Sequence, residues 1–164
     1  MSDPRAELIV PPNTLRAKLG VGTGGLDPEA IKRAEKAMDS LKTEFADWIA
    51  KDITNLYDTF AAFKADGNAA NAGRLFRAAH DLKGQAATFE FPLIARVAGS
   101  LSKLMDGLQS RESAPPVLVE AHVDAIRVIH RDNIKDISNL TALTLVEALE
   151  ARVVQALARA GQNR

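Results

Sequence analysis

The fold follows from the stretch RLFRAAHDLKGQAATFEFPLIARVAGSLSKLMD, residues 74–106, whose first half has a strong helical period. Apolar residues recur there at steps of three and four, and at 100° per residue such positions form one stripe along a helix. The stripe consists of Leu75, Ala79, Leu82, Ala86 and Phe89. His80 lies about 150° from the centre of this stripe. We therefore expect its imidazole to point into solvent rather than into the core.

The face around His80 combines small side chains with cations. Its residues are Gly73, Arg77, Gly84 and Ala87, with Phe76 and Lys83 on one flank. Glycine inside a helix costs about 1 kcal/mol relative to alanine, so Gly84 suggests a need for open space beside His80. Lys83, three residues along the helix, is placed to hold an anion there. Two interpretations remain: close approach by another macromolecule, or an exposed histidine beside a chance glycine.

The segment FRAAHDLKGQAATFEF, followed by LSKLMD, resembles the histidine phosphotransfer (HPt) family, including the phosphotransfer domain of chemotaxis histidine kinases. The family signature is His-x-x-Lys-Gly in a helix, followed by small residues and an aromatic. His80, Lys83, Gly84 and the aromatic Phe89 match this signature, and the resemblance spans about residues 45–108. Two positions depart from the family. Glu90 stands where many members have glycine, and Ser102 stands where the chemotaxis kinases carry a glutamate that contacts the reactive histidine.

The resemblance implies a reversible phosphotransfer step in a two-component phosphorelay. Because no ATP-binding segment is found in the sequence, we expect a free-standing phosphotransfer protein. A hybrid histidine kinase and response-regulator receiver domains are the implied partners. A receiver presents an aspartyl phosphate with its own Mg²⁺, His80 takes the phosphoryl group, and a second receiver removes it. This chain is expected to bind no metal or other cofactor, and to act as a phosphocarrier without ATP-dependent kinase activity.

The resemblance also implies roles for the residues around the histidine. His80 is the nucleophile and carrier, Lys83 steadies the phosphoryl oxygens, Gly84 clears the approach, and Gln85 orients the group. The expected partner-binding residues are Phe76, Arg77 and Ala87, and Phe76 lies only about 40° from His80 on the helical wheel.

Two other functions compete with the relay. One is a dimerising histidine-kinase-like helical fragment, because Asp81 follows His80 as an acidic residue does in those kinases, although Gln85 stands where they have proline. The other is a helical adaptor without chemistry. A relay protein that completes its bundle from one chain should be a monomer, whereas the kinase core is a dimer.

Length and composition exclude several classes of protein. The chain has 164 residues and no cysteine, which suits one domain with a sizeable core and no disulfide. Its 21 basic and 21 acidic residues cancel, so the broad cationic surface of a nucleic-acid binder is not expected. It has no long apolar run and no signal-peptide pattern, so we expect a cytoplasmic protein without a membrane partner.

The chain is expected to divide into a leader, residues 1–26, and an HPt-like bundle domain, residues 27–164. Proline and glycine interrupt the leader, which we expect to be poorly ordered, although Leu8, Ile9 and Val10 could form a short strap. The glycines of residues 20–25 lack the Gly-Lys-Ser/Thr ending of a phosphate-binding loop and are interpreted as a linker.

Start and stop signals predict the helices of the second part. Asp27 and Pro28 begin a first helix that runs to about residue 66, either as one helix or as two that meet near Asp52. The histidine helix should span about 68–90, and further helices should begin near residues 92, 115 and 138. No segment alternates with period two. We therefore predict an all-α, up-and-down four-helix bundle with an N-terminal helical extension.

The same periods predict which residues face the core. The first helix has the stripe Ile31, Ala34, Met38, Leu41, Phe45, Trp48, Leu56, Phe60 and Phe63. The resemblance to the HPt family, which docks its partner on aromatics near the histidine helix, implies that one of its aromatic residues is half exposed. The third helix should bury Leu93, Val97, Leu101, Leu104 and Leu108, and the fourth Leu118, Ala121, Ala125, Val128 and Ile129. The fifth should be capped by Ser138 or Asn139 and bury Leu143, Val146, Val153 and Leu157. His122 and His130 fall at the margins of the fourth stripe without metal-site spacing, so a structural role is expected.

Overall fold

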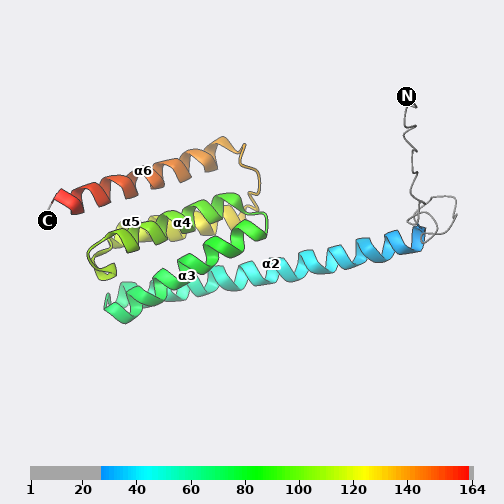
Figure 1. The fold of residues 1–164 in the computed structure, drawn as a ribbon, viewed down its shortest axis with the longest axis horizontal. Helices are drawn as coiled ribbons and strands as arrows, with labels where there is room; N and C mark the ends of the chain where they lie inside the picture. Colours follow the sequence, from blue (N-terminus) through cyan, green and yellow to red (C-terminus); the bar gives the residue numbers. More distant parts are fainter. Residues whose placement is uncertain (1–26, 163–164) are drawn as a thin grey trace, which may run out of the picture. The chain divides into compact units, whose positions relative to one another are not determined.

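Residues 27–162 are described by a computed structural model, and their regular elements are all helical (Figure 1). The elements are α2 (Pro28–Ala65), α3 (Ala69–Thr88), α4 (Pro92–Gly107), the short 3-10 turn η1 (Arg111–Ser113), α5 (Pro116–Arg131) and α6 (Leu140–Gln162). The predicted all-α class is confirmed. None of the helices in this range has the length and hydropathy that a membrane span requires. The predicted leader, its strap and its glycine linker lie outside the described residues.

The first predicted helix is a single element, α2. Asp27 caps it, since its Oδ1 accepts a hydrogen bond from the Glu29 N–H at 3.1 Å, and Pro28 occupies the first helical position. The alternative of two helices meeting near Asp52 is therefore wrong. The chain divides into two units between Ser40 and Leu41. In the first unit Ile31 and Met38 are exposed, so the apolar stripe enters no core there, and residues 28–40 form the predicted helical extension.

The second unit contains the bundle. α3 packs against α4, α4 also contacts α5 and α6, and α5 contacts α6. Two interhelical hydrogen bonds join α2 to α5: Lys64 Nζ donates to Glu120 Oε1 at 2.7 Å, and Arg127 Nη1 donates to the Tyr57 hydroxyl at 2.9 Å. Figure 1 shows α3, α4 and α5 close together, with α6 packed beyond them as a fifth helix. The predicted up-and-down bundle is confirmed.

Most of the predicted core is buried. The whole α3 stripe is buried, as are Leu93, Val97, Leu101 and Leu104 of α4. In α2 the buried residues are Ile49, Ile53, Leu56, Phe60 and Phe63. Trp48 keeps 47 % of its surface exposed, so it is the half-exposed aromatic that was expected. Asn139 caps α6, because its Oδ1 accepts from the Ala142 N–H at 3.0 Å.

The predicted inward face of α5 is partly wrong. Ala125 and Ile129 are buried, but Ala121 and Val128 are exposed. The buried residues of α5 are Val119, His122, Val123, Ala125, Ile126 and Ile129. The buried face of α5 is rotated from the predicted one because the prediction put the polar His122 at the margin of that face. In the structure the His122 side chain is fully buried within it.

Two hydrogen bonds offset the free-energy cost of removing the His122 ring from water. Its Nδ1 lies 2.7 Å from the Leu118 carbonyl oxygen, which only accepts, so Nδ1 carries the proton. Nε2 is then free to accept from the Ser100 hydroxyl at 3.0 Å, which links α5 to α4. Burial lowers the pKa of His122, against the opposing effect of the Leu118 hydrogen bond. The structural interpretation of His122 fits these contacts.

The turn between α3 and α4 contains an unusual backbone conformation. Glu90 has φ 63°, in the left-handed region, and the following Phe91 N–H bonds to the Ala86 carbonyl at 2.9 Å. Glycine adopts this conformation without the steric conflict of a Cβ. The geometry therefore explains why glycine suits this position, and Pro92 then begins α4 at its first turn.

Candidate functional site

His80 lies on the exposed side of α3, opposite the buried stripe, as the wheel predicted. Helix α3 is held at its start by Asn68, whose Oδ1 accepts from the Asn71 N–H at 2.9 Å. Its buried residues Leu75, Ala79 and Leu82 hold the same helix against α4. The backbone of His80 thus belongs to a helix that is packed against α4, while its side chain is exposed to solvent.

An aromatic ring flanks the imidazole. Phe76 is partly buried, and its ring centroid lies 6.0 Å from that of His80 with the two planes 27° apart. Above Phe76, the Arg111 guanidinium carbon lies 3.8 Å from the ring centroid, within cation-π distance. Arg111 Nη2 also donates to Asp106 Oδ1 at 3.1 Å. Phe76 was predicted beside His80, but Arg111 was not, because η1 reaches α3 only through tertiary packing.

An open hollow lies beside His80 between α3 and α4. It is lined by His80, Lys83, Gly84 and Ala87 of α3 and by Ala95, Arg96 and Gly99 of α4. Four of these seven residues are glycine or alanine, so the hollow owes its shape to missing side chains. Its polar groups are an imidazole, an ammonium and a guanidinium, which suits an anion.

The two glycines of the hollow have different surroundings. A Cβ on Gly84 would meet no heavy atom within 4 Å, so internal packing does not require glycine there. A Cβ on Gly99 would lie 3.4 Å from Lys83 Cδ and 3.6 Å from Cε. A side chain at position 99 would therefore be in van der Waals contact with the alkyl chain of Lys83, whereas the space beside Gly84 is open to a partner molecule.

Sequence reasoning missed Arg96. Its Nε donates to Glu150 Oε1 at 3.0 Å and its Nη2 to Oε2 at 2.7 Å, a bidentate pair between α4 and α6. This hydrogen bonding raises the pKa of Arg96. The available signal was the spacing of Arg96 and Gly99, three apart on α4, which places a cation and a gap on neighbouring parts of one face.

The remaining predicted residues lie outside the hollow. Arg77 and Gln85 are exposed on α3 but do not line it. Ser102 is buried, and its hydroxyl donates to the Ala98 carbonyl at 2.9 Å within its own helix. On α2, partial burial and then the negative charge of Asp81 raise the pKa of Asp52. Asp81 therefore adds negative potential between α3 and α2.

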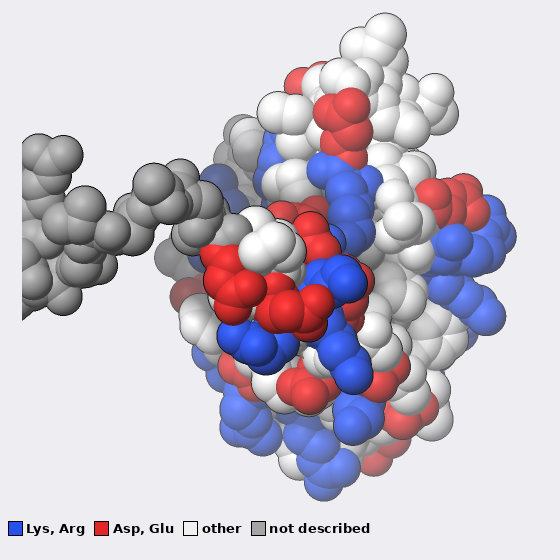
Figure 2. All heavy atoms as spheres, turned by 90° about the vertical axis from the view of Figure 1, so that its right-hand side faces the viewer, with Lys and Arg blue, Asp and Glu red and all other residues white. Residues whose placement is uncertain are grey.

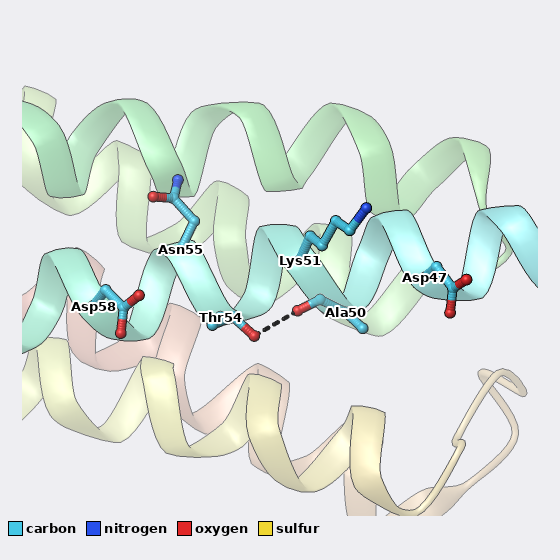
Figure 3. A pocket seen from close by; sticks show the side chains of 6 residues that line it. All are labelled: Asp47, Ala50, Lys51, Thr54, Asn55 and Asp58. Carbon is cyan, nitrogen blue, oxygen red and sulfur yellow. Dashed lines mark hydrogen bonds between the residues drawn. The ribbon is translucent and has the colours of Figure 1, made fainter.

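A second hollow lies on α2 and lacks such chemistry. Figure 3 shows its lining, which comes from this helix alone: Asp47, Ala50, Lys51, Thr54, Asn55 and Asp58. Its one drawn hydrogen bond is internal, from Thr54 Oγ1 to the Ala50 carbonyl at 2.8 Å.

Within residues 27–162 no group of three histidine, cysteine or acidic side chains could hold a metal ion. On the face drawn in Figure 2, basic and acidic side chains are intermixed.

Comparison with known proteins identifies a family. A family model described as Hpt domain matches residues 40–151. This range contains the hollow, the Phe76 contact and most of the bundle. No curated protein and no solved structure matches the chain.

Proposed function

Because the chain belongs to the Hpt domain family, we propose that it relays a phosphoryl group on His80 between the aspartyl phosphates of receiver domains. Hpt domains act in histidine phosphotransfer within phosphorelays and interact with response-regulator receivers. The observation that carries the proposal for this chain is the exposed imidazole beside a hollow lined by Lys83, Gly84 and Ala87. The finer proposal is a free-standing relay protein that a hybrid histidine kinase supplies through its receiver.

The chemistry needs one nucleophilic nitrogen. An unprotonated ring nitrogen of His80 attacks the phosphorus of the aspartyl phosphate, and an N–P bond forms as the P–O bond to the carboxyl group breaks. The electron pair of that bond leaves with the receiver's carboxylate. Transfer to a second receiver reverses these steps. Such transfers depend mainly on positioning and charge neutralisation.

The residues of the hollow divide this work. Lys83 holds the phosphoryl oxygens, while Gly84 and Ala87 let the receiver's aspartate come close. Outside the hollow, Phe76 and Arg77 contact the receiver surface, and the exposed Gln85 orients the group. The receiver supplies Mg²⁺ for the reaction. This chain supplies no cofactor and no ATP-dependent kinase activity of its own.

A two-receiver relay assay tests the proposal. One receiver is charged with radioactive phosphate, and a second, uncharged receiver is added with or without this protein. We expect label to appear on the second receiver only when the protein is present, and not with His80→Gln. His130→Gln is the matched control, since it replaces a half-buried histidine of α5 and should relay normally. Relay by the His80→Gln variant would overturn the proposal.

We also propose that the protein is a monomer. One chain buries a continuous core across α2 to α6, which supports a bundle complete without a second copy. Light scattering after size exclusion should give a mass near 17.6 kDa. A stable dimer would favour the kinase-like helix pair instead.

A further inference from the structure

We propose that Arg96 is a second cation for the phosphoryl group on His80, and that Glu150 of α6 competes with that group for it. The inference rests on the proposed function. It concerns two residues outside the His-x-x-Lys-Gly motif, and it gives α6 a part in setting how long the phosphohistidine lasts.

Arg96 lies where two hollows of the surface meet. It lines the hollow that contains His80 and Lys83. It also lines a neighbouring hollow between α4 and α6, whose lining includes Lys83, Gly99, Lys103 and Glu150. Lys83, Arg96 and Gly99 therefore line both hollows. Arg96 thus borders the hollow of His80 while its guanidinium is bonded to the Glu150 carboxylate of α6.

Arg96 has hydrogen-bond donors that Glu150 does not use. Guanidinium has five N–H donors, and Glu150 takes two of them. The planar arrangement of those donors also suits the oxygens of a phosphoryl group. Arg96 can therefore exchange one oxygen-bearing partner for another without a change in its chemistry.

The ion pair between Arg96 and Glu150 is weak enough to be exchanged. The side chains of Arg96 and Glu150 are 39 % and 37 % exposed, and pairs so open to water contribute little to stability. Glu147 of α6 also acts on Arg96 through its charge, and Lys83 and Lys103 add positive charge near it. A phosphoryl group carries more negative charge than either carboxylate, so it competes well for the guanidinium.

The two partners of the pair should therefore have opposite effects on phosphorylation. Removing the guanidinium takes a cation from the phosphohistidine. Removing the Glu150 carboxylate frees the guanidinium for the phosphoryl group. A pair that only holds α4 to α6 would respond in the same direction to either change, because both variants break it.

The test uses Arg96→Gln and Glu150→Gln, with potassium phosphoramidate as the phosphoryl donor. In this reaction a ring nitrogen displaces ammonia from phosphorus, so no receiver docking is involved. We expect Arg96→Gln to lower the rate of phosphohistidine formation and its half-life by about fivefold to tenfold. Glu150→Gln should raise both by about twofold to fivefold. Arg96→Lys should fall between wild type and Arg96→Gln, since a point charge remains.

A matched control pair exists elsewhere in the bundle. Lys64 and Glu120 form another interhelical ion pair at 2.7 Å, between α2 and α5. Lys64→Gln and Glu120→Gln should leave phosphohistidine formation unchanged, while thermal melting reports any loss of packing in all five variants.

The outcomes separate the inference from the proposed function. If Arg96→Gln and Glu150→Gln both slow the reaction, or if neither changes it while wild type is labelled on His80, the inference is wrong and the relay function stands. If wild type takes no phosphate on His80 from either phosphoramidate or a charged receiver, the proposed function fails, and the inference fails with it.

Discussion

The ring of Phe76 stacks beside the imidazole of His80, with centroids 6.0 Å apart and planes inclined by 27°. Arg111 covers the same phenyl ring at 3.8 Å and is itself bonded to Asp106. The loop after α4 therefore acts on the environment of the histidine through one aromatic side chain. We therefore expect Phe76 to help position the imidazole as well as to offer a contact to a partner.

Replacing Phe76 should slow phosphotransfer. Phe76→Leu removes the stack but keeps an apolar side chain, so we expect a rate about threefold to tenfold lower with a small loss of stability. Arg111→Gln should cause a smaller decrease in the same direction. In a double-mutant cycle Arg111→Gln should add nothing to Phe76→Leu. Additive effects on the transfer rate would show that Arg111 acts independently of the ring.

Replacing Gly84 should have opposite effects on stability and transfer. Gly84→Ala should raise the free energy of unfolding by up to about 1 kcal/mol, because open space surrounds the new Cβ, and Gly84→Gln by somewhat less. Transfer from a charged receiver should fall as the side chain grows. Gly73→Ala is the control, since a Cβ there also meets no atom within 4 Å and lies two turns from His80. A Gly84 variant that melts lower yet transfers normally would assign this glycine to packing.

Glu90 offers a gain in stability without a change in function. With φ at 63° its backbone is strained for a residue with a Cβ, and Glu90→Gly should raise the free energy of unfolding by up to about 1 kcal/mol. Asn133, at φ 49°, is the control, because asparagine tolerates this region and Asn133→Gly should gain less. Chemical denaturation measures both. A loss of stability in Glu90→Gly would mean that the glutamate side chain stabilises the turn.

The buried His122 should make the domain sensitive to mild acid. Burial lowers its pKa in the folded state, so the unfolded chain binds more protons once the pH falls below the unfolded value of about 6.5. Its neutral ring therefore supports folding above that pH, and this support is lost as the pH falls toward the folded pKa. His130, whose pKa burial also lowers, acts in the same direction. Melting temperatures measured between about pH 8 and 5 should fall, and the fall should be smaller in His122→Leu.

The sequence predicted α3 and its two faces well, because one helix's own period determines them. Leu75, Ala79 and Leu82 are buried and His80 is exposed as expected. The face of α5 was assigned less well, since a histidine with two internal hydrogen bonds behaves as a core residue. A helical-wheel prediction puts polar residues on the outer face of a helix. It cannot include a hydrogen-bond partner on another helix, such as Ser100 of α4.

The missing parts of the candidate site come from other helices. Arg96 enters the hollow from α4 and is paired with Glu150 of α6, and Arg111 reaches Phe76 from η1. These contacts join residues far apart in the sequence, so no local spacing contains them. The motif predicted the nucleophile and its nearest cation, whereas the second cation required the packing of α4 against α3 and α6.

The most direct test of the account is to locate the phosphate. The wild-type protein is incubated with a panel of receiver domains charged with radioactive phosphate, then treated with acid or base and mapped by mass spectrometry. We predict label on His80 that survives base and is lost in acid, as expected of an N–P bond, and none on His80→Gln. Label that survives acid, label on the His80→Gln variant, or an unlabelled wild type beside a reference phosphotransfer domain that accepts label would contradict the account.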